Sequence, residues 1–161
     1  MYFQNRSNIT NMRLFLDDYR EPSHCLSYMH LRIGPKHILF AQDWKVVRNF
    51  KEFIEAVTKH HKDITLVSFD HDLSDEHYHH TLMDDPALLK NFYKKQDREM
   101  TGFDCAVWMR DFYLSKGLSL PVILVHSMNP LGTVNIEEVF SHAGIHTPLA
   151  EPEADPKGQE N

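Results

Sequence analysis

Short apolar runs alternate along this chain with segments whose apolar residues recur at helical spacing. Three of the runs, within residues 12–16, 64–69 and 120–125, are continuous enough to be strands covered on both faces of a sheet. Strands that alternate with helices form mostly parallel sheets, because each right-handed crossover packs its helix against one face. The sequence therefore predicts a three-layer α/β fold, with a mostly parallel sheet and helices on both faces.

Capping residues mark where the predicted helices begin and end. Asn49 precedes an amphipathic segment, FKEFIEAVTKHH, and Thr101 precedes a second segment that stops at Gly117. A third helix follows the turn at Pro130 and should end at Gly144. Each of these helices follows a predicted strand, as a parallel sheet requires.

Four other segments have weaker patterns. Residues 19–25, YREPSHC, predict a loop, since the proline at position 22 prevents a regular helix start. A second strand is expected within residues 38–47 and a fifth within 145–149. The polar residues 75–100 predict a long excursion from the sheet, with a short helix after Pro86.

The length of 161 residues fits one domain. We expect this domain to span residues 12–149, with an insertion at about 75–100. Residues 1–11 predict a flexible N-terminal segment, and residues 150–161 have the composition of a disordered tail.

Composition and charge restrict the partners of the chain. A formal net charge of −6 argues against an extended duplex nucleic acid, which needs a basic surface, but it allows a small phosphorylated substrate. No apolar run approaches the roughly 20 residues of a membrane span, and no secretory signal is visible. Cys25 and Cys105 have neither metal nor redox spacing. We therefore expect a cytoplasmic protein without membrane contact, and its oligomeric state stays open.

Polar clusters follow three of the predicted strands. Asp17 and Asp18 follow the first, the triplet Asp70-His71-Asp72 follows the third, and His126-Ser127 follow the fourth. The carboxyl ends of parallel strands lie at one edge of a sheet, where α/β proteins bind their ligands. In a flavodoxin-like strand order these three strands are neighbours, so we expect the clusters to meet.

The acidic residues of these clusters predict a metal site. Several carboxylates in one crevice disfavour each other's ionised forms unless a cation compensates. Magnesium or manganese takes carboxylate oxygens and shares its shell with a phosphate, and we expect Asp17, Asp18 and Asp70 to hold it. Asp72 or His71 would complete the site or orient water. Taken alone, an adjacent acid pair is more often a loop or helix cap.

The remaining polar residues predict phosphate chemistry. His126 is a candidate general acid or base near neutral pH, and Ser127, Asn129 and Arg20 are candidates to hold a phosphate. Each also has a structural interpretation: His126 as a satisfied core histidine, Asn129 as part of a turn, and Arg20 as a surface residue paired with an acid.

The motifs LFLDDYREP, SFDHDL followed by TGFDCAVWM, and VHSMNP together resemble the cyclic-phosphate processing receiver domain family. The resemblance implies a receiver-like fold and a metal-binding site that processes cyclic phosphate linkages in nucleotides or RNA ends. It places the family's acid pair at Asp17 and Asp18, and the phospho-acceptor position of a receiver at Asp70. The family signatures fall on His71 and Asp72 after the third strand, and on the following residues after the fourth: His126, Ser127 and Asn129. One departure is that no lysine follows the expected fifth strand within IHTPLAEP.

Three functions are therefore compared. The first is a metal-dependent phosphoesterase acting on a cyclic nucleotide or an RNA 2′,3′-cyclic phosphate end, with Asp70, Asp72, His71 and His126 as its catalytic residues. The second is a signalling receiver that is phosphorylated on Asp70, which the missing lysine disfavours. The third is a non-catalytic module that binds a nucleotide or a metal.

Overall fold

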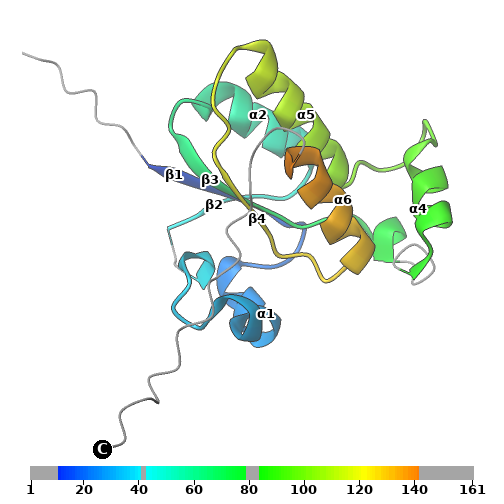
Figure 1. Ribbon diagram of the computed structural model, residues 1–161, viewed down its shortest axis with the longest axis horizontal. Helices are drawn as coiled ribbons and strands as arrows, with labels where there is room; N and C mark the ends of the chain where they lie inside the picture. Colours follow the sequence, from blue (N-terminus) through cyan, green and yellow to red (C-terminus); the bar gives the residue numbers. More distant parts are fainter. Residues whose placement is uncertain (1–10, 41–42, 79–83, 142–161) are drawn as a thin grey trace, which may run out of the picture.

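The computed structural model describes residues 11–40, 43–78 and 84–141, which form a four-stranded, wholly parallel sheet (Figure 1). The strand order is β2-β1-β3-β4, so the chain reverses its direction of travel across the sheet after β2. The strands are β1 (Met12–Leu16), β2 (Lys45–Val47), β3 (Ile64–Phe69) and β4 (Val122–Val125). This order makes β1, β3 and β4 neighbours, as the sequence predicts.

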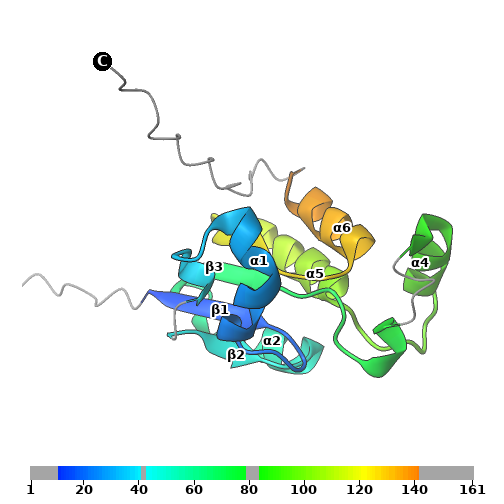
Figure 2. The same cartoon turned by 90° about the horizontal axis from the view of Figure 1, so that it is seen from below.

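Helices cover both faces of the sheet, which confirms the three-layer α/β fold. Figures 1 and 2 show α1 on one face and α2, α5 and α6 on the other. The described helices are α1 (Leu26–Ile33), α2 (Phe50–His60), α4 (Pro86–Tyr93), α5 (Gly102–Ser115) and α6 (Pro130–Ser141). No helix in the described ranges is long and apolar enough to cross a membrane.

The predicted caps are present at α2 and α5. The Asn49 side chain accepts a hydrogen bond from the backbone N–H of Glu52. Thr101 and Asp104 form a reciprocal capping box, which satisfies two N–H groups at the start of α5. After α5, Gly117 has a φ of +62°, a left-handed conformation that a glycine adopts without strain.

Of the two expectations for residues 19–47, the loop is wrong and the second strand is present but short. Pro22 does not leave a loop: it begins a 3-10 helix, Pro22–Cys25, that leads directly into α1. Proline is tolerated there because the first N–H groups of a helix need no partner inside the helix. Ile38–Phe40 is also a 3-10 helix, so the second strand is confined to Lys45–Val47. The expected fifth strand at 145–149, the helix end at Gly144, residues 1–10 of the N-terminal segment and the tail lie outside the described residues.

Side chains along each strand point alternately to the two faces of the sheet, and this divides the core into two parts. Leu14 and Leu16 pack with residues of α2, α5 and α6, whereas Phe15 packs on the opposite face with Met29 of α1 and Trp44. The same alternation continues past the strand ends, because successive side chains point to opposite faces. It therefore determines which side of the sheet each polar residue reaches.

The excursion at 75–100 contains a 3-10 helix, Asp75–Tyr78, and the expected short helix after Pro86, which is α4. His77 anchors it: this buried side chain accepts a hydrogen bond from the Leu73 N–H through Nδ1 at 2.8 Å, and its Nε2 lies 3.2 Å from the Glu99 carbonyl. The His77 side chain is therefore part of the packed structure and is shielded from solvent.

Candidate functional site

Three polar clusters meet at the carboxyl edge of the sheet. Asp17, Asp70 and His126 directly follow the last paired residues of β1, β3 and β4. The backbone N–H of Asp70 donates to the Leu16 carbonyl at 2.8 Å, and that of His126 donates to the Phe69 carbonyl at 2.9 Å. These bonds extend the ladder by one residue on each strand, so the side chains emerge next to one another.

The three acids predicted to hold a metal come together. One carboxylate oxygen from each of Asp17, Asp18 and Asp70 lies within 4.8 Å of the other two. Asp17 and Asp70 are buried, and Asp18 is half-buried. We call these three residues the acidic cluster.

Arg20 joins two members of the acidic cluster. Its Nε lies 2.7 Å from Asp17 Oδ2, and its Nη2 lies 2.8 Å from Asp70 Oδ2. Its Nη1 donates to the Tyr28 hydroxyl of α1 at 2.7 Å. Burial alone would lower the pKa of Arg20, but the charges of Asp70 and Asp17 raise it above its ordinary value. The guanidinium is therefore a fixed cation between the two acids.

Asp17 has all of its acceptor sites occupied. Its Oδ1 accepts from the backbone N–H groups of Tyr19 and Arg20, and its Oδ2 contacts Arg20 Nε and, at 3.2 Å, His126 Nε2. Burial alone would raise the pKa of Asp17, but the bonds and charges of His126 and Arg20 outweigh it and lower the pKa to about 2. An ionised carboxylate has about four lone-pair sites, so none remains for a further ligand unless a donor moves.

Asp70 has fewer polar contacts than Asp17. Arg20 Nη2 contacts Asp70 Oδ2, and a hydrogen bond from Ser127 opposes the rise in pKa that burial causes. Its side chain is 1% exposed, and its Oδ1 accepts no hydrogen bond within the described part of the chain. Burial raises the pKa of Asp70, although the charges of His126 and Arg20 oppose the shift. A buried carboxylate oxygen without a donor is costly, and a bound cation would satisfy it.

Asp18 has an environment between these two extremes. The hydroxyl of Tyr78, from the excursion, donates to Asp18 Oδ1 at 3.0 Å. Burial, together with the nearby charge of Asp17, raises the pKa of Asp18 in spite of that hydrogen bond. Asp18 and Asp70 are therefore the two acids whose surroundings most favour a divalent cation, and the donor set of the cluster fits Mg²⁺ or Mn²⁺.

His126 lies beneath the acidic cluster and has no exposed surface. Its ring stacks on Phe15 with centroids 4.1 Å apart, and its Nδ1 lies 2.7 Å from the Ser68 hydroxyl. Because Nε2 contacts Asp17, both ring nitrogens have protein partners. The ring is thus placed to hold Asp17 in position.

His71 and Asp72 form a second cluster on the opposite side of the sheet edge. His71 Nδ1 lies 2.7 Å from Asp72 Oδ1, and His71 Nε2 lies 2.7 Å from the Tyr93 hydroxyl of α4. Asn129 donates through Nδ2 to Asp72 Oδ1 at 3.2 Å, and its Oδ1 accepts the N–H of Gly132 at 2.9 Å. We call His71, Asp72, Asn129 and Tyr93 the support cluster.

The predicted site residues are thus divided between two places. Arg20, His126 and the acidic cluster lie on the α1 side, whereas His71, Asp72 and Asn129 connect β3 to α4 and α6. Ser127 is buried, and its hydroxyl accepts the backbone N–H of Asn129 at 3.1 Å.

Three contacts of the site are not predicted from the sequence. Ser68 contacts His126, Tyr28 contacts Arg20, and Tyr78 contacts Asp18. Ser68 and Asp70 are two residues apart, and side chains two apart on a strand point to the same face of the sheet, so the position of Ser68 could have been predicted. The two tyrosines come from a helix that we expected to be a loop and from the excursion, and nothing in their local sequence indicates these contacts.

The sequence model of the family described as the cyclic-phosphate processing receiver domain matches residues 12–142. No curated protein and no solved structure matches the chain. The match includes all four strands and both polar clusters at their ends. This chain therefore belongs to the cyclic-phosphate processing receiver domain family.

Proposed function

We propose that this chain is a metal-assisted phosphoesterase that opens a cyclic phosphate, in a small nucleotide or at an RNA 2′,3′-cyclic end. The description of its family supports cyclic phosphate as the substrate class. The observation that carries the metal part is the buried Oδ1 of Asp70, which lacks a donor and lies within the acidic cluster. In the reaction, a water oxygen binds phosphorus, one ring P–O bond breaks, and the released oxygen takes up a proton.

Asp70 and Asp18 would hold the cation, with Asp17 beside them as a ligand if Arg20 shifts. When bound there, Mg²⁺ or Mn²⁺ would lower the pKa of a water molecule and neutralise charge on the phosphoryl oxygens. This assignment keeps the three predicted metal residues but gives them unequal roles, because Asp17 already has four donors.

Arg20 is the residue we assign to the phosphate. A guanidinium has five N–H donors, and three of them are directed to Asp17, Asp70 and Tyr28. The two that remain would donate to phosphoryl oxygens, and the buried acids fix their direction. Preorganised donors of this kind stabilise developing charge without reorganising during the reaction.

We assign a positioning role to His126 in place of the general-acid role expected from the sequence. Its two ring nitrogens contact Asp17 and Ser68, and its ring is fully buried against Phe15. We give His71 and Asp72 a supporting role for the same reason, since their polar atoms contact Tyr93 and Asn129.

The experiment that tests this function is hydrolysis of 2′,3′-cyclic nucleotides, 3′,5′-cyclic nucleotides and RNA with a 2′,3′-cyclic end. Each substrate is measured with Mg²⁺, Mn²⁺ or chelator. Asp70→Asn is compared with Asp75→Asn, which changes an exposed acid of the excursion. We expect turnover that requires metal and Asp70 but not Asp75, and hydrolysis that survives in Asp70→Asn would contradict the proposal.

The alternative is a module that binds a nucleotide or metal without turnover. The full engagement of both His126 nitrogens favours it, because it leaves that ring no free nitrogen for proton transfer. Metal-dependent binding of a cyclic nucleotide that is recovered intact would select this alternative.

A further inference from the structure

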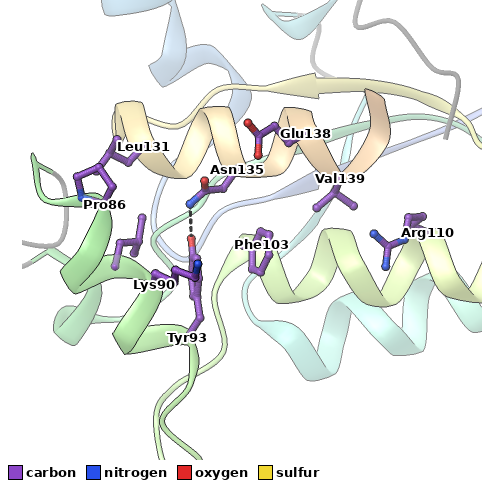
Figure 3. Close-up of a pocket in the computed structure, with 10 residues that line it drawn as sticks. Pro86, Lys90, Tyr93, Phe103, Arg110, Leu131, Asn135, Glu138 and Val139 are labelled. Atoms are coloured by element: carbon purple, nitrogen blue, oxygen red, sulfur yellow. Dashed lines mark hydrogen bonds between the residues drawn. The ribbon is translucent and has the colours of Figure 1, made fainter. Parts of the chain in front are cut away.

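A cavity of about 440 Å³ lies between α4, α5 and α6 (Figure 3). Its volume is in the range of pockets that bind small molecules. Its lining includes Lys90 and Tyr93 of α4, Phe103 and Arg110 of α5, and Leu131 and Asn135 of α6. No member of the acidic cluster lines it, so this cavity is a separate feature of the molecule.

The cavity presents an aromatic wall. The rings of Tyr93 and Phe103 stack on each other with centroids 4.5 Å apart and an interplanar angle of 18°. Both side chains are half-buried, and Figure 3 shows them on facing helices at the centre of the pocket. Apolar side chains, among them Leu131 and Val139, form much of the remaining lining. This surface fits a flat, largely apolar group.

The cavity also has one directional acceptor. Asn135 Nδ2 donates to the Tyr93 hydroxyl at 3.2 Å, which fixes the orientation of the amide (Figure 3). The Asn135 Oδ1 therefore keeps a defined direction, and within the described ranges it has no protein donor. An N–H group of a heterocycle would complete this hydrogen bond.

Charge completes the description of the site. In Figure 3, Lys90 lies beside Tyr93 on α4, Arg110 lies further along α5, and Glu138 lies on α6. Arg110 forms an ion pair with Asp111, whereas Lys90 has no acidic partner among the residues that the structure describes. Lys90 is thus the cation available to an anionic group of a ligand.

We propose that this cavity binds a planar nitrogen heterocycle that carries an anionic group, the chemistry of a nucleoside monophosphate. The base packs against Tyr93 and Phe103 and donates an N–H to Asn135 Oδ1, and the phosphate contacts Lys90. This is a second nucleotide site, and it does not depend on whether the acidic cluster is catalytic.

A chain of hydrogen-bonded side chains connects the cavity to the edge of the sheet. The Tyr93 hydroxyl that accepts from Asn135 also lies 2.7 Å from His71 Nε2. His71 in turn contacts Asp72, which accepts from Asn129. A ligand that reorients Asn135 or Tyr93 therefore changes the hydrogen bonding of the residues that directly follow Asp70.

The test is a titration of the full chain with 5′-AMP, 5′-GMP, 5′-CMP and 5′-UMP. Calorimetry measures the affinity, and NMR measures the chemical-shift changes of the backbone amides and histidine side chains. Lys90→Glu is compared with Lys94→Glu, which makes the same charge change just beyond α4 and outside the lining. We expect Lys90→Glu to weaken binding of at least one nucleotide by about tenfold, equivalent to 1.4 kcal/mol, and Lys94→Glu to leave it unchanged.

Asp70→Asn separates this site from the acidic cluster. Binding that persists in Asp70→Asn, with shifts at Tyr93 and His71, supports the cavity whether or not the chain hydrolyses any substrate. Binding lost in Asp70→Asn but kept in Lys90→Glu would place the nucleotide at the acidic cluster and overturn the inference. Absence of binding by all four nucleotides would overturn it as well.

Discussion

Arg20 and Asp70 form an ion pair at the carboxyl edge of the sheet, with Nη2 and Oδ2 2.8 Å apart. The same guanidinium contacts Asp17, so one arginine bridges acids that follow two neighbouring strands. All three side chains are buried or nearly so, at 16%, 0% and 1% exposure for Arg20, Asp17 and Asp70. Losing one partner of such a group leaves an uncompensated buried charge, which costs much more than the intact pair contributes.

Arg20→Ala should therefore destabilise the chain strongly when no metal is present. We expect the free energy of unfolding in chelator to fall by about 3–5 kcal/mol, measured by urea denaturation. Mg²⁺ or Mn²⁺ should restore part of the loss, because a divalent cation takes over the compensation of Asp70. Arg13→Ala, which removes a partly exposed ion pair with Asp43, is the matched control and should change stability by less than about 1 kcal/mol. Equal effects of the two substitutions would contradict the role of Arg20.

Asp70→Asn should have the opposite effect on stability in chelator. Because burial raises the pKa of Asp70, its ionised form is less favourable in the folded chain than in water. Asparagine removes this buried charge with a side chain of the same shape, and Arg20 keeps Asp17 as its partner. We expect the melting temperature without metal to be equal to or above that of the unchanged chain. Stabilisation by divalent cations should disappear in the same variant, whereas cation at 100 times its Kd should add about 2.7 kcal/mol to the unchanged chain.

Asp75→Asn is the control for that measurement, since Asp75 is an exposed acid. It should keep the full stabilisation by metal. A cation-dependent rise in melting temperature that persists in Asp70→Asn would exclude Asp70 as a ligand.

The strand order and the meeting of the polar clusters are predictable from the sequence. Three apolar runs that end in acids or a histidine, joined by helices, allow few parallel topologies, and the neighbouring positions of β1, β3 and β4 follow from one of them. The metal residues Asp17, Asp18 and Asp70 are close in space for that reason. Whether they bind a metal remains a prediction.

The direction of each side chain at the sheet edge is not among the predictions from the sequence. Val67, Phe69 and His71 lie at every second position along β3 and its end, so their side chains point to the same face of the sheet. Val67 and Phe69 pack on that face with residues of α5 and α6. This two-residue spacing predicts that the His71 side chain points to the face opposite that of Asp70, toward the support cluster. The position of Arg20 depends instead on the local turn after Asp17 and on its contact with Tyr28 of α1, and the sequence pattern does not predict that contact.

The pH dependence of stability should show the lowered pKa of Asp17. A carboxyl group whose folded pKa is about 2 and whose ordinary value is 3.8 stabilises the folded state above pH 4, and this contribution is lost as the pH falls from about 4 to about 2. One pKa unit corresponds to about 1.4 kcal/mol, so Asp17 contributes about 2 kcal/mol at neutral pH. Asp17→Asn should therefore lower stability at pH 7 and flatten the acid limb of the stability curve.

Part of that acid limb should remain in Asp17→Asn. Burial would raise the pKa of Asp104, but hydrogen bonds from Arg98 and Thr101 outweigh it and lower the pKa. The ionised form of Asp104 therefore also stabilises the folded state, and this contribution is lost as the pH falls. Urea denaturation at intervals between pH 7 and pH 2 measures both contributions. An acid limb identical in Asp17→Asn and in the unchanged chain would contradict the assignment to Asp17.

The packing of His71 against α6 predicts a specific steric effect at Gly132. A Cβ at this position would lie 2.3 Å from His71 Cγ, so Gly132→Ala must displace the ring and break its contacts with Asp72 and Tyr93. We expect a loss of about 1–3 kcal/mol in the free energy of unfolding, typical of an overpacked core. The double variant Gly132→Ala/His71→Ala removes the clash, so its destabilisation should be smaller than the sum of the two single changes. A double-mutant cycle by urea denaturation measures this coupling, and strict additivity would show that His71 and Gly132 do not pack as described.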